Sequence, residues 1–423
     1  MNINAFRVGI LVAQTPEEFV CTPVRRCPFD AEGSAKRFEL LKMYLERPNQ
    51  GEKLEAIQVQ VSLDATAHRT EFPPIFVYDF FSGCGGTSAG FRAAGMKPIL
   101  ALDIDLEALS TFSENFKDAA VIARDVRKLS TADLEHLFER ERTSPILFSA
   151  CAPCQPFSKQ NRQKKSNDDR ASLLNELGRF VRRFRPEFVV VENVPGLQNI
   201  SEDEDGPLHQ LVELLDELGY WHTTKIVQAL DYGVPQNRRR LVMLASIFGP
   251  IGFPKPRYGE GRKPMKTVRQ AIGHLPPIEA GTSDDTVPNH YACSLAPQNL
   301  ERIRAVKEGG GRRSWADHLK LECHREVRGY TDVYGRMSWD SPSPALTTRC
   351  ISLSNGRFGH PEQDRAISIR EAACIQTFPD DFLFKGSVNG MARQIGNAVP
   401  PRLAEEIGRY LIEHFKTWSD SDG

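Results

Sequence analysis

The feature that most constrains the fold is an alternation of short apolar segments with helical stretches, which begins near residue 75. Helical spacing occupies several of the intervals, at residues 89–94, 108–115 and 172–184. Strands and helices in alternation predict an α/β fold with a doubly wound, mostly parallel sheet and helices on both faces. The predicted strands are residues 75–81, 98–102, 119–123, 146–150, 188–191, 223–229 and 241–246.

The rest of the chain is organised differently. Residues 249–288 are dense in proline and glycine, which predicts a separate, loop-rich unit. Order returns with predicted helices at 369–378, ended by Pro379, and at 401–415. Residues 1–73 carry no interpretable motif, although 33–46 has helical spacing. A chain of 423 residues is long enough for one large core and a smaller second unit.

Charge is balanced overall but uneven along the chain. The formal net charge of −1 argues mildly against a nucleic-acid-binding protein. Residues 238–313, however, hold fourteen basic and six acidic side chains, and residues 159–185 hold nine and three. Residues 202–217 hold seven acids and no base. A basic face for nucleic acid can therefore exist within a neutral total.

Cysteine usage and hydropathy indicate the compartment. Nine scattered cysteines are not a disulfide framework and suit reduced thiols in a cytosol. No segment approaches the roughly 20 apolar residues of a membrane span. The apolar residues 8–13 are too short for a signal peptide, and we expect a strand or buried segment there.

The first candidate site is the glycine-rich turn Phe80-Phe-Ser-Gly-Cys-Gly-Gly86, between a predicted strand and a helix. Glycines there permit a tight turn and close approach of a ligand to the backbone. Asp103 follows at the end of the next strand, where a carboxylate can bind ribose hydroxyls, and Asp125 follows the third strand. By itself the pattern also fits a glycine turn without a ligand.

The second candidate is Cys154 in Pro153-Cys-Gln-Pro-Phe-Ser158, after the strand at 146–150. A thiol on this proline-bounded turn could be a lone nucleophile, since the thiolate is the reactive form. Cys151-Ala-Pro-Cys154 also has the spacing of a redox pair or of half a zinc site. A buried, inert cysteine is a further alternative.

An acid and two cations are predicted near the same sheet edge. Glu192 ends the apolar strand at 188–191, where a carboxylate needs a partner or a proton. Arg238 and Arg240 would share one face of an extended segment, with Arg239 on the other, and could hold a thiolate or phosphate. A strand-end acid in water and a basic loop are the plainer interpretations.

One chemistry uses a methyl-donor site, a thiolate, an acid and cations together. A thiolate that adds to carbon 6 of cytosine, with protonation of ring nitrogen 3, makes carbon 5 nucleophilic. Carbon 5 can then take a methyl group from S-adenosylmethionine, and loss of its proton and of the thiolate restores the ring.

Eight segments, in this order, resemble the motifs of the DNA cytosine-5 methyltransferase family. They are Asp79-Phe-Phe-Ser-Gly-Cys-Gly-Gly86, Asp103-Ile-Asp105, Asp125, Pro153-Cys-Gln-Pro-Phe-Ser158, Glu192-Asn-Val194, Gln236-Asn-Arg-Arg-Arg240, Arg370-Glu-Ala-Ala-Cys-Ile-Gln-Thr-Phe-Pro379 and Gln394-Ile-Gly-Asn-Ala-Val-Pro-Pro401. The family usually has Glu at the position of Asp103, and Cys374 is a second mild departure.

The resemblance implies a class I S-adenosylmethionine-dependent methyltransferase fold and a set of site residues. Cys154 would be the nucleophile, Glu192 would hold a flipped-out cytosine, and Arg238 and Arg240 would be the paired arginines. No metal is expected. S-adenosylmethionine would bind at Phe81, Gly83, Gly85, Gly86, Asp103, Ile104, Asp125, Val126, Pro153, Leu173, Asn397 and Val399.

The resemblance also implies a domain plan. Residues 74–248 and 380–416 would form the catalytic domain, and 249–379 a target-recognition domain with its supporting helix. Within it, about 248–334 would read double-stranded DNA, with the loop at Gly309-Gly-Gly-Arg-Arg313 entering a groove. The basic loop at 159–170 would close over the extruded base. Residues 1–73 would be an extension of unknown role, and 417–423 a polar tail.

The expected setting is a monomeric, cytoplasmic modification enzyme of a bacterial restriction–modification system, with a cognate endonuclease as a partner and no membrane. The rival functions are a tRNA cytosine-5 methyltransferase and a non-catalytic DNA-binding module of the same fold. Members that methylate tRNA carry Cys-Phe-Thr, which is absent here. A nicotinamide-dependent oxidoreductase fits the glycine spacing poorly. On this interpretation Cys151 is a bystander whose replacement leaves methylation largely intact.

Overall fold

The computed structural model describes residues 72–138, 144–152, 173–196, 206–322 and 332–419. Several expectations lie outside these residues. They concern the segments at 8–13 and 33–46, the loop at 159–170, and the two motif residues Pro153 and Cys154.

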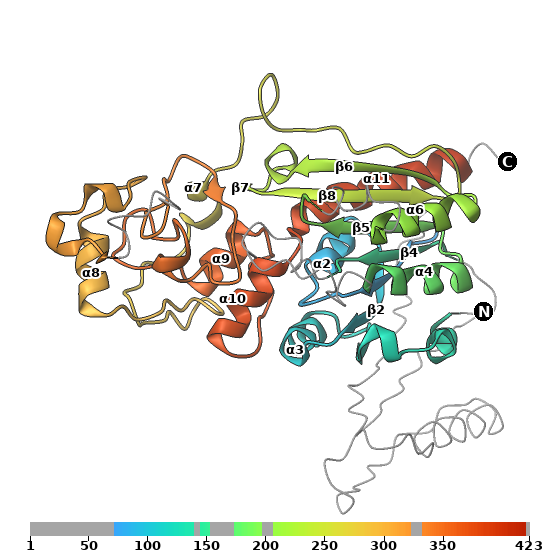
Figure 1. The fold of residues 1–423 in the computed structure, drawn as a ribbon, viewed down its shortest axis with the longest axis horizontal. Coiled ribbons are helices and arrows are strands. Elements are labelled where there is room, and N and C mark those ends of the chain that lie inside the picture. Colours follow the sequence, from blue (N-terminus) through green and yellow to red (C-terminus); the bar gives the residue numbers. More distant parts are fainter. Residues whose placement is uncertain (1–71, 139–143, 153–172, 197–205, 323–331, 420–423) are drawn as a thin grey trace, which may run out of the picture.

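The core of the molecule is a seven-stranded sheet in the order β3-β2-β1-β4-β5-β8-β6 (Figure 1). Strands β1 to β5 run parallel to one another, and β8 runs antiparallel to both β5 and β6. Each predicted strand is confirmed with small shifts at its ends. The strands are β1 Phe76–Phe80, β2 Lys97–Asp103, β3 Ala120–Ala123, β4 Ile146–Ala150, β5 Phe188–Asn193, β6 Trp221–Gln228 and β8 Arg239–Ser246.

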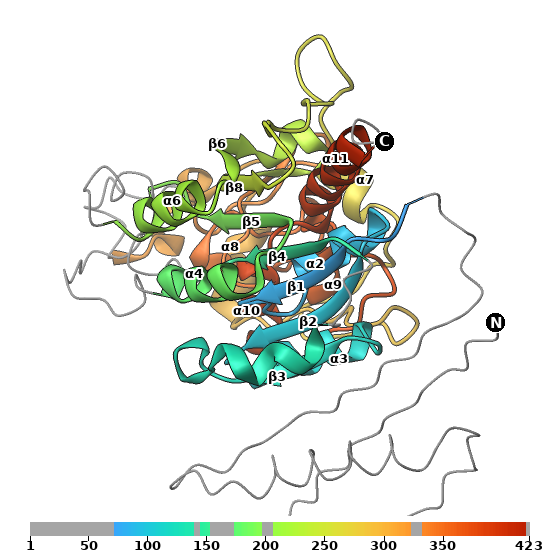
Figure 2. The same cartoon turned by 90° about the vertical axis from the view of Figure 1, so that its right-hand side faces the viewer.

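Helices cover both faces of this sheet, as predicted (Figure 2). On one face, α4 (Leu173–Phe184) and α6 (Pro207–Glu217) pack against side chains that include Tyr78. On the other, α2 (Gly86–Ala93) and α11 (Pro401–Ser419) pack against Val77 and its neighbours, and α3 (Leu106–Asn115) lies beside β2 and β3. Adjacent residues of a strand face opposite sides of the sheet. Since the central strands are apolar at consecutive positions, both faces of the sheet offer apolar side chains to the helices.

The segment after β8 forms a smaller, mostly irregular part at one end of the sheet (Figure 1). It contains the short helices α7 (Val268–Ile272) and α8 (Pro297–Arg304), and a two-residue strand β9 (Ser343–Pro344) that pairs with β7 (Gln236–Asn237). The predicted supporting helix is α9 (Ile369–Ile375), which ends four residues before Pro379, and α10 (Val388–Asn397) follows.

A shared apolar cluster joins this smaller part to the sheet. It includes Leu109 and Phe112 of α3, Ile369 and Ile375 of α9, and Ile395 of α10. All five side chains are almost fully buried. At about 25 cal/mol per Å² of apolar area, such burial opposes separation of the two parts. Among the described residues, no helix is both long and apolar enough to cross a membrane.

Candidate active site at the carboxyl end of the sheet

The turn between β1 and α2 has a backbone that requires glycine. Gly83 and Gly85 have positive φ of 51° and 91°, a region that side chains disfavour, and Phe81 also has φ of 57°. A Cβ on Gly85 would lie 2.7 Å from the Phe116 ring, and one on Gly86 would lie 2.5 Å from the carbonyl oxygen of Val399. Gly85 and Gly86 therefore let the turn pack against α3 and the segment at Val399, whereas Gly83 faces open space that a ligand can approach.

Asp103, at the end of β2, closes this turn from the neighbouring strand. Its carboxylate accepts hydrogen bonds from the backbone N–H groups of Gly83 at 2.8 Å, Ile104 at 2.7 Å and Asp105 at 2.9 Å. Burial raises the pKa of Asp103, and these backbone N–H groups oppose that shift. The next side chain, Ile104, is 69% exposed and offers an apolar surface beside the carboxylate. Together they suit a ligand with hydroxyl groups next to a flat apolar ring.

Asp79 lies beneath the turn, inside β1, and is completely buried. The hydroxyl of Ser88 in α2 donates to its carboxylate at 2.7 Å. Burial raises the pKa of Asp79 to about 7, because the charged form loses its hydration. The bond between Asp79 and Ser88 joins β1 to α2 on either side of the turn, a role that its place at the start of a motif does not reveal.

Asp125, one of the residues expected to bind S-adenosylmethionine, already has a partner in Arg127. The guanidinium of Arg127 donates to both carboxylate oxygens, with Nη2–Oδ2 at 2.6 Å, and the Arg127 backbone N–H donates to Oδ1 at 3.0 Å. These contacts hold the pKa of Asp125 below its usual value, with the Arg127 side chain as the largest cause. An adenine amino group at Asp125 would have to share the carboxylate with Arg127.

Glu192, at the end of β5, is buried at 6% exposure and contacts two groups. Its Oε2 accepts from the thiol of Cys151 at 2.8 Å, and its Oε1 forms an ion pair with Nε of Arg240 at 2.7 Å. The second contact lacks hydrogen-bond geometry, so Oε1 has no hydrogen-bond donor among the described residues. A buried carboxylate oxygen in this state is an acceptor available to a ligand.

Cys151 contacts Glu192 directly, a contact that the interpretation of Cys151 as a bystander did not include. Strands β4 and β5 pair with Ala150 opposite Val191, so the next residues, Cys151 and Glu192, meet at the sheet edge. The amide of Asn193 also donates to the backbone oxygen of Ala152 at 3.1 Å. The chain that leads into the nucleophile motif is therefore fixed beside Glu192. Strand register, which sequence alone leaves open, is what reveals this contact.

Arg238 and Arg240 have separate surroundings, contrary to the expectation that both guanidiniums act on one thiolate or phosphate. Arg238 is buried at 1% exposure and donates to the backbone oxygens of Leu346 at 3.0 Å, Gly396 at 2.9 Å and Ala398 at 3.2 Å. It connects the end of the sheet to the later segments of the chain, which makes it a positioning residue. Arg240 alone reaches Glu192.

The remaining predicted residues are spread around the same edge. Val399 is buried against the glycine turn, whereas Asn397, two residues earlier, is exposed. Val126 is buried after β3, and Leu173 is half-buried at the start of α4. Gln236, buried and bonded through its amide to Gln376 at 2.6 Å, was noted only as part of a motif.

The fold and the edge together define a class of protein. Parallel strands in this order with one antiparallel strand, and a glycine turn closed by an acid on the second strand, are those of a Rossmann-like class I methyltransferase fold. The sequence profile of the C-5 cytosine-specific DNA methylases matches residues 75–413. The chain therefore belongs to this family and is a DNA cytosine-5 methyltransferase, as the motifs predicted.

Individual relatives agree with this assignment. The chain is similar to the type II methylase M.HgiDII of Herpetosiphon aurantiacus, with 35% identity over 79% of this chain and 94% of the relative. It is also similar to the type II methyltransferase M1.HphI of Haemophilus parahaemolyticus, with 34% identity over 79% and 86% of the two chains.

Solved structures share the fold. A candidate DNA modification methyltransferase encoded within an Escherichia coli prophage has a TM-score of 0.63 at 24% identity, covering 81% of this chain and 99% of the other. The Entamoeba histolytica methyltransferase EhMeth has a TM-score of 0.56 at 17% identity, with the same coverage. At these identities the likeness supports the architecture alone.

Proposed function

We propose that the chain methylates carbon 5 of cytosine within a specific double-stranded DNA sequence by covalent addition of Cys154 to a flipped-out base. The observation that carries this proposal is the state of Glu192. Among the described residues its buried Oε1 has an ion pair with Arg240 but no hydrogen-bond donor, while Arg240 and Cys151 fix the carboxylate in place. A polar edge of a bound base would supply the missing donor.

The residues around the glycine turn fit S-adenosylmethionine, the methyl donor of the family. A Cβ on Gly83 would point into open space, which a ligand can occupy, Asp103 would accept from the ribose hydroxyls, and Ile104 would lie against the adenine. When bound there, S-adenosylmethionine supplies an electrophilic methyl group. We extend the pocket to the family positions Phe81, Asp125, Val126, Pro153, Leu173, Asn397 and Val399.

The chain's own groups would carry the rest of the reaction. The Cys154 thiolate would form a bond to carbon 6 while Glu192 donates a proton to ring nitrogen 3, which makes carbon 5 the nucleophile for the methyl group; breaking the methyl–sulfur bond would leave S-adenosylhomocysteine. The carbon-5 proton then leaves to a base, and the thiolate is expelled as the ring is restored. Arg240 orients Glu192, and Arg238 acts indirectly by holding the segment that ends at Val399.

We further propose that residues 249–379 recognise the target sequence, while 74–248 and 380–416 form the catalytic domain. In the loop expected to enter a DNA groove, Gly309 has a positive φ of 67° and Arg313 is exposed. Arg357 donates to the carbonyl oxygen of Gly310 at 2.9 Å and so fixes the base of this loop. A fixed base with an exposed arginine suits entry into a groove or a phosphate contact.

The bacterial relatives named as type II methylases suggest a biological setting. We propose that the chain is the modification enzyme of a restriction–modification system, acts as a monomer in the cytoplasm, and protects sites that a cognate endonuclease cuts. Residues 1–73 would serve some purpose outside this catalytic plan.

A methyl-transfer assay tests the proposal. The full chain is incubated with labelled S-adenosylmethionine and either bacterial DNA or tRNA, beside Cys154→Ala. We expect label in DNA only, and none with the variant. Label in tRNA alone would refute the DNA substrate, and label in DNA that persists in Cys154→Ala would refute the covalent mechanism.

Trapping the intermediate tests the mechanism directly. DNA with 5-fluorocytosine at the target should form a complex that survives denaturation, because fluorine cannot leave as the carbon-5 proton does. Glu192→Gln should fold but lose turnover by roughly 10²- to 10⁴-fold, the usual contribution of a general acid or base. Glu187→Gln, at the opposite end of β5, is the matched control and should retain turnover.

A further inference from the structure

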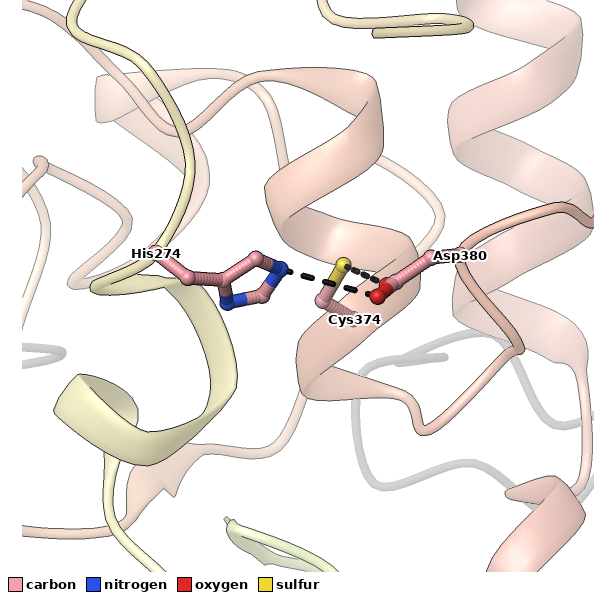
Figure 3. A group of neighbouring side chains, drawn as sticks. All are labelled: His274, Cys374 and Asp380. Carbon is pink, nitrogen blue, oxygen red and sulfur yellow. Dashed lines mark hydrogen bonds and ion pairs between the residues drawn. The ribbon is translucent and has the colours of Figure 1, made fainter.

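Figure 3 shows a group of three potential metal ligands, none of which belongs to the active-site edge described above. His274 follows α7, Cys374 lies in α9, and Asp380 follows the end of α9. The Cys374 sulfur is 3.4 Å from Oδ1 of Asp380, and Nε2 of His274 is 3.7 Å from Oδ2 of the same carboxylate. All three ligand atoms lie within 4.8 Å of one another.

These separations suit one tetrahedral ion. Zinc lies about 2.3 Å from a thiolate sulfur and about 2.0–2.2 Å from imidazole nitrogen or carboxylate oxygen, so tetrahedral ligands are separated by roughly 3.3–3.6 Å. The two contacts, which use different oxygens of Asp380, are therefore near the required spacing, and a small rotation of the carboxylate would present one oxygen to the ion. We propose that His274, Cys374 and Asp380 bind one Zn²⁺, with water in the fourth position. Binding forms the Zn–S bond and releases the thiol proton to solvent.

The donor set favours zinc over harder cations. Magnesium and calcium prefer sites made of oxygen, whereas a thiolate with an imidazole and one carboxylate suits zinc. The ion also has a route to the site, because the His274 and Asp380 side chains are 52% and 72% exposed. The sulfur is more enclosed, since Cys374 as a whole is only 8% exposed.

The surrounding structure holds the ligands in position. The guanidinium of Arg370 donates to the carbonyl oxygens of Pro379 at 3.2 Å and Phe382 at 2.8 Å, which fixes the turn that carries Asp380 against α9. On the other side, α7 packs against α9 through Ile272, which is 1% exposed, and His274 follows two residues later. A site assembled on packed helices needs little rearrangement to accept an ion.

The proposal departs from the expectation of no metal. These ligands come from two segments about one hundred residues apart in sequence, so no short motif announces them. A bound ion would fasten the segment after α7 to the supporting helix, and so stiffen the part of the chain proposed to read DNA. The site itself does not depend on the proposed catalytic function.

Cobalt binding to the full-length protein provides the test. Co²⁺ reports a thiolate ligand through a charge-transfer band in the near ultraviolet. Because the chain has nine cysteines, wild type is compared with His274→Ala and Cys374→Ala. The matched controls are Cys293→Ala, a half-buried thiol in the same part of the chain, and His209→Ala, a half-buried histidine on α6.

We expect wild type and both controls to show the thiolate band with one equivalent of Co²⁺ that Zn²⁺ displaces. Cys374→Ala should lose that band. His274→Ala, which changes an exposed side chain and should fold normally, should weaken Zn²⁺ binding by at least about 10-fold, the lower end of what even an indirect metal partner contributes. A band that is absent from wild type, or that is unchanged in both site variants, would overturn the proposal.

Thermal unfolding supplies an independent readout. Zn²⁺ should raise the melting temperature of wild type and of His209→Ala, because the ion binds the folded chain. The rise should be absent in His274→Ala and in Asp380→Asn. An equal rise in these two variants would place the ion elsewhere and refute this site.

Discussion

The buried carboxyl group of Asp79 leads to a prediction about stability and pH. Its pKa is raised from 3.8 to about 7 by burial, so the folded chain binds this proton more tightly than the unfolded chain does. The stabilisation from this group is therefore fully present below about pH 4 and is lost as pH rises through 7. Between pH 5 and pH 7 the loss amounts to about 2 kcal/mol, at about 1.4 kcal/mol per pKa unit.

Asp79→Asn should remove this dependence, because the amide keeps the shape of the side chain and can still accept from Ser88. Urea unfolding followed by circular dichroism at pH 5, 6, 7 and 8 gives the free energy of unfolding of both proteins. Between pH 5 and pH 7, we expect the free energy of unfolding of the variant to rise by about 2 kcal/mol relative to that of wild type. Other titrating groups cancel in this difference.

Asp340→Asn is a control, because the stabilisation from this carboxylate should depend on pH in the opposite direction. Its exposed carboxylate pairs with Arg269, which holds the pKa of Asp340 below its usual value. Its contribution is present above the unfolded pKa and is lost on acidification. A difference between wild type and Asp79→Asn that stays constant from pH 5 to pH 8 would show that Asp79 is ionised in the folded chain, and would refute the reasoning.

Three further predictions concern the active-site edge and its support. Cys151→Ala should lower kcat by roughly 2- to 10-fold, because one hydrogen bond to Glu192 is lost, and Cys151→Ser should restore kcat. Unchanged methylation in the alanine variant would show that Cys151 is a bystander. Arg238→Met should lower the free energy of unfolding by about 3 kcal/mol or more, because buried carbonyl oxygens lose their donor; a melting curve like that of wild type would contradict this. Gly90→Ala should cost about 1–3 kcal/mol in thermal unfolding and weaken S-adenosylmethionine binding in calorimetry, because its Cβ would lie 2.2 Å from the Pro401 oxygen. Wild-type values for both quantities would show that α2 and α11 can separate freely.

The sequence predicted the sheet well, because its strands are buried on both faces. The run at residues 188–191 is apolar throughout, and it ends at a polar residue, Glu192, which marks the edge of the sheet where the site lies. Helix α6 escaped prediction, since its polar face coincides with the acidic run at 202–217. The end of α9 was placed three residues late, because the apolar spacing continues to Phe378 after the helix has ended.

Side-chain partnerships were harder to predict than the positions of the motifs. The contact of Cys151 with Glu192 depends on strand register, and that of Asp125 with Arg127 on a local turn. Arg238 looked like a catalytic cation because alternation places it on the same face as Arg240. Its real partners are carbonyl oxygens more than one hundred residues later, which no local pattern contains.

The packing of α11 on the sheet has a consequence for how the enzyme is made. The last strand of the sheet ends at Ser246, but one face of the sheet is covered by the last helix, α11. On that face α11 packs against α2, the first described helix. At 5–20 residues per second, a ribosome needs about 10 to 35 s to go from β8 to the end of α11. During that interval the nascent sheet has an uncovered apolar face. A chain released early would therefore be a substrate for chaperones or proteases, and a methyltransferase only when synthesis is complete.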